Sequence, residues 1–246
     1  MKVKLQGVRY RLPNFSLGPI DMDVEPGKIY VVMGKNGSGK STTLKLIHGD
    51  IRPSEGTVLV DGVDASKIGF IQLAKKIAFV WQEIYNPLSF TVKDVMNVSG
   101  YSRDADEDDI FKALSVLGIE RFIDRDFNLL SGGEKRLVTI AAALYQDSEI
   151  IIMDEPTNFL DIDNQILVYN LIRDLRNSGK TLILTLHDID AIHNISDYVL
   201  ILKDGMEVAK GPTRETLNVQ NLRKAFNVPF YTYDTVNGKS FVGAMK

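Results

Sequence analysis

A glycine-rich loop between a short apolar run and an expected helix constrains this chain more than any other feature. Residues 28–43 read KIYVVMGKNGSGKSTT, in which Gly34, Gly39, Lys40 and Ser41 fit the pattern G-x-x-x-x-G-K-[ST]. Glycines let the backbone curl so that successive N–H groups point at one anion, and the following helix adds the positive end of its dipole. The flanking strand and helix disfavour a chance match on an ordinary turn.

This loop is predicted to hold the phosphate chain of a nucleotide. Lys40 can reach the β- and γ-phosphates, and the Ser41 hydroxyl can ligate Mg²⁺. The predicted nucleotide-binding residues of the loop are Gly34, Lys35, Asn36, Gly37, Ser38, Gly39, Lys40, Ser41 and Thr42.

Composition narrows the class of protein. With 246 residues, the chain is long enough for one large α/β domain or for a core domain with an inserted lobe. Its content of 44% hydrophobic and 25% charged residues is typical of a soluble globular protein. A net charge of −3 gives no general basic surface, so no nucleic-acid partner is expected. The absence of cysteine excludes disulfides and thiolate metal sites and agrees with a cytosolic location.

The hydropathy pattern predicts that no segment crosses a membrane. There is no run of 18 apolar residues, and the N-terminus, MKVKLQGVRYRLP, has no apolar core of signal-peptide length. If the chain serves a membrane process, we expect it to be a peripheral subunit.

The first third of the chain predicts antiparallel strands around one buried strand. Alternating residues predict an edge strand over 2–10 and another strand over 17–24. Residues 57–60 form a short strand closed by Asp61-Gly62, a hairpin signal, and 76–81 read as a buried strand. Residues 84–146 read as a mostly helical insertion, with helices opening near Thr91, Asp109 and Gly133.

The rest of the chain returns to buried strands alternating with helices. Residues 148–154 and 181–186 are apolar runs typical of a parallel sheet. Asp161 starts a helix whose predicted apolar stripe is Ile162, Ile166, Tyr169, Ile172 and Leu175, or residues next to these. Asp188 caps a short helix, 198–210 form a hairpin, and 213–226 form an interrupted helix. Asn237-Gly238 signals a C-terminal hairpin. This order predicts an α/β fold of the P-loop type, with its chemistry at the carboxyl ends of the strands.

Three polar groups follow such strands. Asp154 is predicted to bind the metal through its water shell, and Glu155 to polarise a water that attacks the γ-phosphate. A solvated acidic turn is the alternative, which the phosphate loop disfavours. His187, after residues 181–186, can donate to a γ-phosphate oxygen, with a core or capping histidine as the alternative. His48 and His193 are interpreted as structural.

Gln82 follows the strand IAFVW at the start of the helical insertion. Its neutral amide can ligate Mg²⁺ or orient water, and at this junction it could also sense the position of the insertion. An ordinary surface glutamine is the alternative.

The sequence LSGGE, residues 130–134, predicts a second anion-binding helix start. Ser131 and Glu134 fit a capping box, and Gly132 and Gly133 leave backbone N–H groups approachable. One nucleotide needs only one phosphate cradle, so a second one on the helical insertion suggests a site closed by two surfaces. An ordinary capped helix is the alternative.

Together these segments closely resemble the ATP-binding subunit of ABC transporters, and the order of motifs matches from residue 1 to about residue 210. GKNGSGKST looks like the family's Walker A motif, LSGGE like its signature, and IIIMDEPT like its Walker B motif with the glutamate. Residues 158–161 look like the D-loop, Gln82 like the Q-loop glutamine, and His187 like the switch histidine.

The resemblance implies a P-loop NTPase fold of the ABC-ATPase type. Residues 1–246 would form a single ABC ATPase domain. Within it, residues 1–83 and 147–246 would form a RecA-like core with an antiparallel β subdomain, and 84–146 an inserted helical subdomain. ATP and Mg²⁺ are the implied cofactors, with Ser41, Gln82 and Asp154 around the metal and Glu155, Gln82 and His187 as catalytic groups.

The resemblance also implies partners. Two such domains would pack head to tail, so that Ser131, Gly132 and Gly133 of one cap the γ-phosphate held by Lys40 of the other. Asp161 would lie at that interface. Tyr10 resembles the aromatic that stacks on adenine, with Phe15 or a core role for Tyr10 as alternatives. The helical subdomain and the Gln82 region would dock a transmembrane permease at the cytoplasmic face of the cell membrane, and a substrate-binding protein would be an indirect partner.

Among subfamilies the chain looks most like the ATPases of iron-siderophore, haem and cobalamin importers. The segments HGDIRPSEGTVLVDG, NFLDI and LHDID carry this likeness. Departures are Lys135-Arg136-Leu137 after the signature and Trp81 where proline is common. The implied function is ATP hydrolysis that energises import of metal chelates. An exporter subunit or a soluble accessory ABC ATPase are the alternatives.

Overall fold

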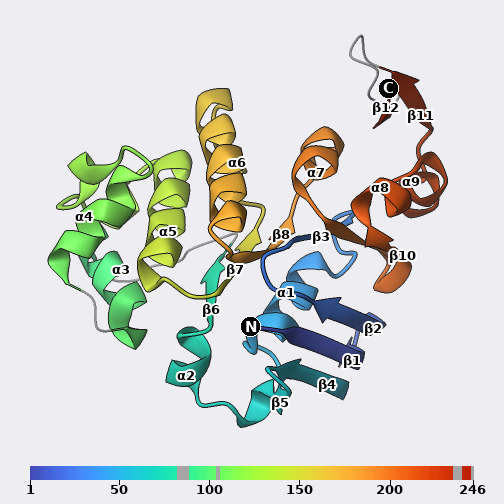
Figure 1. Ribbon diagram of the computed structural model, residues 1–246, viewed down its shortest axis with the longest axis horizontal. Coiled ribbons are helices and arrows are strands. Elements are labelled where there is room, and N and C mark those ends of the chain that lie inside the picture. Colours follow the sequence, from blue (N-terminus) through green and yellow to red (C-terminus); the bar gives the residue numbers. More distant parts are fainter. Residues whose placement is uncertain (82–88, 104–105, 235–239, 245–246) are drawn as a thin grey trace.

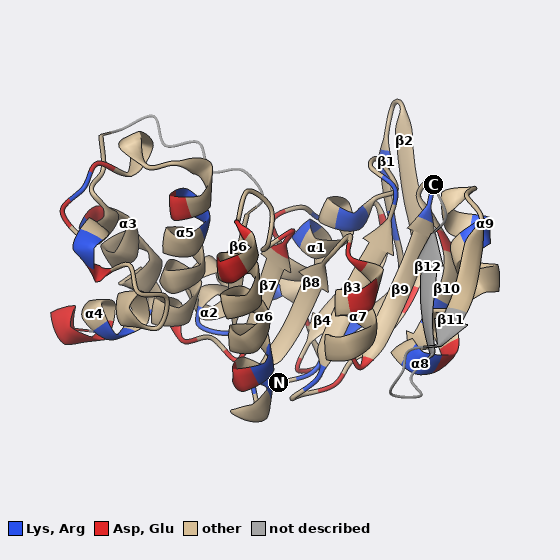
Figure 2. Ribbon diagram, turned by 90° about the horizontal axis from the view of Figure 1, so that it is seen from above, with Lys and Arg blue, Asp and Glu red and all other residues tan. Residues whose placement is uncertain are grey.

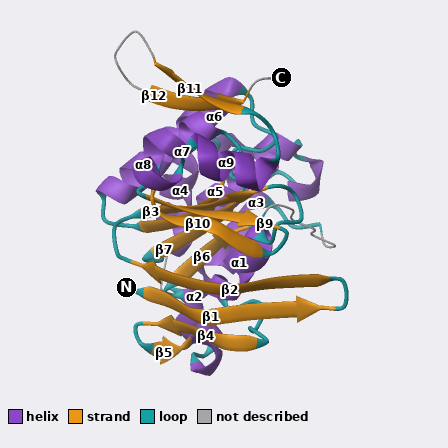
Figure 3. Ribbon diagram, turned by 90° about the vertical axis from the view of Figure 1, so that its right-hand side faces the viewer, coloured by secondary structure: helices purple, strands orange, loops and turns teal. Residues whose placement is uncertain are grey.

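A computed structural model describes residues 1–81, 89–103, 106–234 and 240–244, with side chains up to residue 232. Two β-sheets lie one above the other, and several helices cover the outer face of the larger sheet (Figure 3). Gln82 and the Asn237-Gly238 turn, both singled out from the sequence, lie outside the described residues.

The larger sheet has six strands in the order β10-β9-β3-β8-β7-β6, and β3 lies near its centre. Strands β9, β3, β8, β7 and β6 are parallel, and β10 is an antiparallel edge. The predicted buried strands are confirmed, because every residue of β3, β7 and β8 is buried. The strands are β3 (Ile29–Gly34), β6 (Ile77–Val80), β7 (Ile150–Asp154), β8 (Thr181–Thr185), β9 (Tyr198–Lys203) and β10 (Met206–Pro212).

The smaller sheet is antiparallel, in the order β2-β1-β4-β5. The first strand was predicted as an edge, which is wrong: β1 pairs with β2 on one side and β4 on the other. Alternation along a strand reports which face is buried, and it does not report whether both edges are paired. The strands are β1 (Val3–Leu12), β2 (Phe15–Val24), β4 (Glu55–Val60) and β5 (Val63–Asp64).

Helix α1 (Lys40–His48) packs between the two sheets (Figure 1). Its Leu44, Leu46 and Ile47 belong to one apolar cluster with Val3 and Leu5 of the smaller sheet. The other face of the larger sheet is covered by α6 (Ile162–Asn177), α7 (Ile189–Ile195), α8 (Thr213–Thr216) and α9 (Val219–Phe226). A two-stranded hairpin of β11 (Phe230–Asp234) and β12 (Ser240–Ala244) follows. Because α1 is packed between the two sheets, it holds the end of the glycine-rich loop in place.

The predicted helical insertion forms a lobe beside β6, which we call the helical lobe (Figure 1). It contains α3 (Val92–Ser99), α4 (Glu107–Ser115) and α5 (Gly132–Gln146), with 3-10 turns at Gly100–Ser102, Glu120–Phe122 and Phe127–Leu129. Its apolar residues belong to the same core cluster as the covered face of the larger sheet. Basic and acidic residues are interspersed along the ribbon, in agreement with the small net charge (Figure 2).

Local capping explains where these helices begin. Thr91 caps α3 and Ser131 caps α5, each in a complete capping box, so both predicted starts are confirmed. Helix α4 was predicted to open at Asp109 but begins at Glu107, because the Asp106 carboxylate accepts the Asp109 N–H at 3.0 Å. The short helices Ala65–Lys67 and α2 (Phe70–Ala74) were not predicted.

The predicted apolar stripe of α6 is partly wrong. Ile162 and Ile166 are 74% and 53% exposed, whereas Val168, Leu171 and Ile172 are buried. The spacing of apolar residues along a helix does not show whether each of them is buried in the core or exposed.

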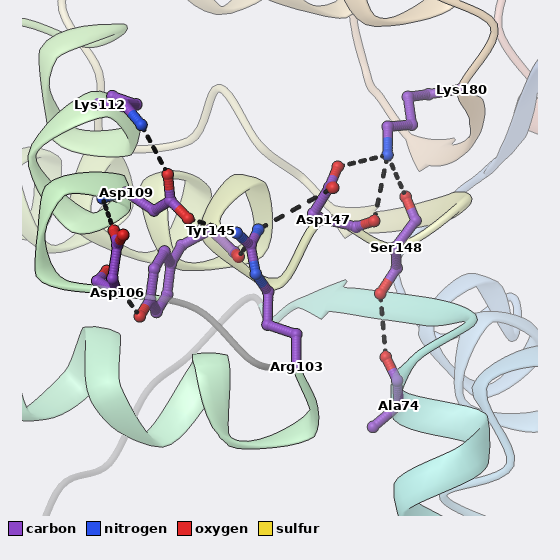
Figure 4. Close-up of polar contacts among 9 residues, drawn as sticks. All are labelled: Ala74, Arg103, Asp106, Asp109, Lys112, Tyr145, Asp147, Ser148 and Lys180. Carbon is purple, nitrogen blue, oxygen red and sulfur yellow. Dashed lines mark hydrogen bonds and ion pairs between the residues drawn. The ribbon is translucent and has the colours of Figure 1, made fainter.

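Polar contacts join the C-terminal end of α5 to both lobes (Figure 4). Arg103 of the helical lobe donates to the Tyr145 carbonyl at 2.8 Å and to Asp109 at 2.7 Å. From the other lobe, Lys180 donates to Asp147 at 2.7 Å, and Ser148 donates to the Ala74 carbonyl at 2.9 Å. This end of the helix is therefore anchored to both lobes of the molecule.

His48, at the end of α1, is packed in an aromatic cluster between the lobes. Its ring meets Phe79 edge-on at 5.1 Å and Trp81 at 5.7 Å. Burial lowers the pKa of His48 below its usual 6.5, against the opposing effect of Asp50, so the folded protein holds the neutral ring. His48 is structural, as the sequence suggested.

This burial predicts an acid-dependent loss of stability. Below pH 6.5 the unfolded chain takes up a proton that folded His48 resists, so the free energy of unfolding falls as pH decreases. Between pH 7.5 and 5.5 we expect His48→Gln to lose about 1 kcal/mol less than the unchanged protein in urea unfolding. The control, His193→Gln, is expected to follow the unchanged protein. Equal losses in all three proteins would contradict the prediction.

Candidate functional site

The glycine-rich loop connects β3 directly to α1, as predicted. Gly34 ends β3 with φ +154°, and a Cβ there would lie 2.3 Å from the Leu202 carbonyl oxygen. Gly39 has φ +102°, and a Cβ there would lie 2.6 Å from Leu17. Gly37 also has positive φ but faces open space. Close packing and backbone conformation therefore require the two outer glycines, while the middle of the loop stays open to a ligand.

Lys40 is the cation of this loop. It is only 5% exposed, and its ammonium donates to the Gly34 carbonyl at 3.1 Å and the Lys35 carbonyl at 3.4 Å. Burial lowers its pKa, while the carboxylates of Glu155 and Asp154 act in the opposite direction. A buried ammonium held mainly by carbonyl oxygens is well placed to bind an anion.

The fit to a phosphate chain can be tested on the loop itself. Within the described part of the chain, the Ser38 hydroxyl is one of three buried side-chain polar groups that lack a hydrogen-bond partner. The loop therefore offers an unused hydroxyl, a buried cation and an open glycine at one place, as a phosphate site requires.

Asp154 ends β7, and Glu155 follows it directly. In the sheet, β8 lies between β7 and the central strand β3. Thr185 in β8 is buried; its hydroxyl donates to Asp154 Oδ1 at 2.6 Å and accepts the Glu155 N–H at 2.8 Å. The Glu155 backbone has φ +51°, which is uncommon for a residue with a side chain. Thr185 therefore fixes the turn that directs Asp154 and Glu155.

Glu155 is the centre of a small polar cluster. Its Oε1 accepts from His187 Nε2 at 2.6 Å and lies 4.0 Å from the Lys40 ammonium. Its other oxygen accepts a hydrogen bond from the Asn158 amide. A cavity of about 390 Å³ opens here, lined by Asn36, Gly37, Lys40, Ser41, Glu155, Asn158 and His187. The structure thus brings the loop, Glu155 and the half-exposed His187 together around one space.

Thr185→Val provides a test of this turn. The substitution preserves the β-branched shape but removes both hydrogen bonds, leaving the Glu155 N–H and Asp154 less satisfied. We expect unfolding free energy to fall by about 1–3 kcal/mol and ATP turnover to fall with it. Thr185→Ser retains the hydroxyl and is the matched control. A Val variant as stable and active as the Ser variant would contradict the role of Thr185.

Metal binding would need oxygen atoms beyond the protein's own. Among the described residues no group of three or more His, Cys, Asp or Glu side chains could hold an ion. Ser41 lines the cavity, and Asp154 lies at the adjacent strand end. A hard ion such as Mg²⁺ fits these few oxygen ligands if the nucleotide phosphates complete its shell.

The signature residues lie apart from this cavity. Ser131, Gly132 and Gly133 begin α5 in the helical lobe, and Ser131 and Gly132 are exposed. A Cβ on Gly133 would lie 2.9 Å from the Phe159 carbonyl oxygen, so this helix start packs against residues 158–161. Asp161 is exposed and caps α6. Their nucleotide contact with a second subunit remains a prediction.

The aromatic residues near the loop differ in position. Tyr10 is partly buried against the core between the sheets, and it pairs with Leu17 across β1 and β2. Phe15 lies beside the loop, since its ring would be 3.2 Å from a Cβ on Gly39. Stacking of adenine on Tyr10 remains a prediction, with Phe15 as the alternative.

Sequence reasoning missed one residue of this edge, Thr185, and one residue of α5, Arg136. Thr185 lies two positions before His187 within an apolar run, where a threonine reads as an ordinary strand residue. Arg136 was noticed only as a departure after LSGGE, although it is buried. Thr185 bonds to Asp154 and Glu155, and Arg136 donates to the Trp81 carbonyl. No local sequence pattern predicts these contacts, because they join distant segments of the chain.

Comparison with known proteins identifies the family of this chain. A family model described as "ABC transporter" matches residues 17–158, which include the loop, the signature and both carboxylates. The chain belongs to the ABC transporter family. As an ABC ATPase it binds nucleotide and hydrolyses ATP, and the sequence-based identification and fold class are confirmed.

Curated relatives of this ABC ATPase cover most of its length. An uncharacterized ABC transporter ATP-binding protein of Methanocaldococcus jannaschii is 36% identical over 87% of both chains. The achromobactin transport ATP-binding protein of Dickeya dadantii is 33% identical, over 85% of this chain and 81% of its own. A hemin import ATP-binding protein of Agrobacterium fabrum is 30% identical over 86% and 85%.

Solved structures give the same family. One titled as an inward-facing conformation of a putative metal-chelate type ABC transporter superposes with a TM-score of 0.83 at 26% identity, covering 99% of this chain and 97% of that one. A dimeric ATP-binding cassette bound to ADP and Pi in a post-hydrolysis state gives 0.77 at 28% identity, covering 85% and 98%. No helix in the described part of this ABC ATPase is long and apolar enough to cross a membrane.

Proposed function

We propose that this ABC ATPase energises a membrane importer of metal chelates, of the iron-siderophore, haem or cobalamin class. The proposal depends on the likeness, over 99% of this chain, to a chain of the structure titled as a putative metal-chelate type ABC transporter. The achromobactin and hemin relatives support the same cargo class. The chain would act at the cytoplasmic face of the membrane, with a substrate-binding protein as an indirect partner.

In this proposal the nucleotide edge divides its tasks among residues already placed. The loop N–H groups, Ser38 and Lys40 would hold the phosphates. Ser41, Asp154 and Gln82, the last outside the described residues, would hold Mg²⁺, whose charge would offset that of the phosphates. Glu155 takes a proton from the attacking water. His187 donates to the Glu155 carboxylate at 2.6 Å and would also donate to the γ-phosphate.

The second surface comes from another copy of the chain. Ser131 and its glycines are exposed at a capped helix start, in agreement with a role toward a partner's phosphate. Phe159, Ile162 and Ile166 add exposed apolar side chains at and near Asp161. The dimeric cassette structure supports a pair of such subunits, which this proposal arranges head to tail. The division into a core of residues 1–83 and 147–246 and a helical insertion of 84–146 belongs to the same proposal.

An apolar groove between the lobes is the proposed permease site. It encloses about 690 Å³ and includes Phe70 and Tyr101, each 81% exposed, with Val98 and Trp81. Exposed apolar side chains on both sides of a groove are typical of a surface that a partner protein covers. We propose that a short helix of the permease occupies this groove, which is lined by residues of α2 and α3.

Purification from detergent-solubilised membranes tests the proposal. The tagged chain is expected to retain a membrane permease, and Phe70→Glu to lose it because the groove would gain a charge. Nucleotide affinity should stay within about twofold, since the cavity at Lys40 is separate. Val63→Glu, at an exposed apolar residue of the smaller sheet, is the control and should keep the permease.

Two results would contradict the proposal. Absence of any membrane protein with the unchanged chain would favour a soluble accessory ATPase. A reconstituted complex whose ATP turnover responds to none of ferric siderophore, haem or cobalamin would remove the proposed cargo class.

A further inference from the structure

The groove between the lobes contains two buried polar groups that the chain itself does not use. In the described part of the chain, three buried side-chain polar atoms lack a hydrogen-bond partner, and one of them, Ser38 Oγ, belongs to the phosphate loop. The other two, His48 Nδ1 and Ser102 Oγ, belong to residues that line the groove. His48 ends α1, and Ser102 lies in the helical lobe, so both sides of the lobe junction contribute one such group.

Three further polar side chains of the groove are satisfied within the chain. Each donates to a backbone carbonyl: Ser99 at 3.0 Å, Thr139 at 2.8 Å and Gln146 at 2.6 Å. Buried polar groups in folded proteins are nearly always paired in this way. The lack of a partner is therefore particular to His48 and Ser102 and is not a general property of this surface.

The turn that carries Ser102 is held in place from both ends. A Cβ on Gly100 would lie 2.2 Å from the Tyr145 ring, so a glycine is needed for the turn to lie this close to α5. After the turn, Arg103 donates to the Tyr145 carbonyl at 2.8 Å (Figure 4). Ser102 is only 7% exposed, and a buried hydroxyl without a partner is costly. A fixed and unsatisfied group at the groove points to a partner outside the chain.

The groove also lacks formal charge. Among the described residues that line it, none is Asp, Glu, Lys or Arg. Burial lowers the pKa of His48, so its ring is neutral. A neutral imidazole and a hydroxyl can each donate or accept a hydrogen bond, whereas a charged group entering this apolar space would lose its hydration. The groove therefore favours neutral polar groups in its occupant.

We propose that the permease helix in this groove carries neutral hydrogen-bonding side chains, amides or hydroxyls, on its apolar face, and that His48 Nδ1 and Ser102 Oγ bind them. The inference rests on the proposed function, because the occupant is the permease helix named there. Contacts with exposed Phe70 and Tyr101 give the helix apolar area. The two polar groups make the groove selective, because a wholly apolar helix would cover them and leave them unsatisfied.

Ser102→Ala tests the inference through two effects of opposite direction. The permease that the tagged chain retains is purified in lipid nanodiscs, and its Kd for the chain is measured by biolayer interferometry. The variant is expected to bind about threefold to tenfold more weakly, because the hydrogen bond to the helix is lost. Its urea unfolding midpoint without permease should equal or exceed that of the unchanged protein, since an unsatisfied hydroxyl is removed. A purely structural role would lower stability together with affinity.

Two controls use neighbouring side chains. Ser99→Ala makes the same change in the same groove, but the Ser99 hydroxyl already donates to the Val95 carbonyl. Its Kd for the permease should stay within about twofold. Lys45→Ala tests for a charged occupant, because the Lys45 ammonium lies 5.7 Å from the Trp81 ring, which lines the groove. This variant should also stay within about twofold, whereas a permease carboxylate in the groove would make it bind much more weakly.

Crosslinking identifies the chemistry of the occupant. A photo-crosslinking residue replaces Tyr101, which is 81% exposed and precedes Ser102. Mass spectrometry of the product locates the permease helix. Each Ser, Thr, Asn or Gln of that helix is then changed to Ala. One of these changes is expected to weaken binding as much as Ser102→Ala does, and the combined change should cost little more than either alone.

The outcomes separate the inference from the proposed function. Ser102→Ala with an unchanged Kd, losses that are additive for every permease residue tested, or a crosslink to a second copy of the chain would each overturn the inference. If Ser102→Ala does not fold, His48→Phe replaces it, because it keeps an aromatic ring against Phe79 and Trp81 and lacks Nδ1. An unchanged Kd in this variant would overturn the inference as well. An unchanged chain that retains no permease would count against the proposed function and would remove the inference with it.

Discussion

Glu155→Gln is expected to lower ATP turnover at least about 100-fold, because a neutral amide cannot accept the proton of the attacking water. The replacement has nearly the same shape. It retains an oxygen that can accept from His187 Nε2, which now lies 2.6 Å from Glu155. Nucleotide affinity, measured by calorimetry with Mg²⁺ and ATP, should therefore stay close to that of the unchanged protein.

The same variant is expected to accumulate as an ATP-bound dimer, because the phosphate contacts persist when hydrolysis is blocked. Size-exclusion chromatography with saturating ATP and Mg²⁺ measures this. Glu215→Gln, at an exposed glutamate, is the control and should turn over ATP normally. A Glu155→Gln protein that stays monomeric would count against the two-surface model, and one with normal turnover would remove Glu155 as the base.

Lys40→Ala is expected to weaken nucleotide binding by about 2–4 kcal/mol, or roughly 30- to 1,000-fold in Kd. The buried ammonium is the cation of the loop, and its loss leaves phosphate charge unmatched in a site of low dielectric. Calorimetric titration with ATP in EDTA isolates this effect from the metal.

Lys45→Ala tests whether the loss is specific. Lys45 is on the same helix, but its ammonium lies 5.7 Å from the Trp81 ring, toward the groove. Its replacement should leave ATP affinity within about twofold, as expected for a distant site. If Lys40→Ala binds ATP as tightly as Lys45→Ala, Lys40 is not part of the nucleotide site.

Features encoded in consecutive residues could be predicted from the sequence. The glycine-rich loop, the capping boxes at Thr91 and Ser131, and the buried strand ending at Asp154 each depend on neighbours in the chain. The meeting of the glycine-rich loop and Asp154 at one sheet edge followed from the rule that parallel strands end together.

Features that depend on distant segments could not be predicted. The second neighbour of β1 is β4, some fifty residues later in the chain. The Thr185 hydroxyl accepts the Glu155 N–H, thirty residues earlier in the chain. Arg136 donates to the Trp81 carbonyl, fifty-five residues earlier. Exposure of Ile162 and Ile166 reflects a surface that one chain leaves uncovered.

The anchoring of α5 at its C-terminal end has a mechanical consequence. Contacts of Arg103, Lys180 and Ser148 hold the helix near Tyr145 and Asp147, while Ser131 caps its other end. Its 15 residues give a lever arm of about 22 Å. A tilt of about 10° around the anchored end would therefore swing Ser131 by about 4 Å, more than the length of a hydrogen bond. A small rotation at the anchored end of α5 is therefore enough to make or break a contact of Ser131 at the other end.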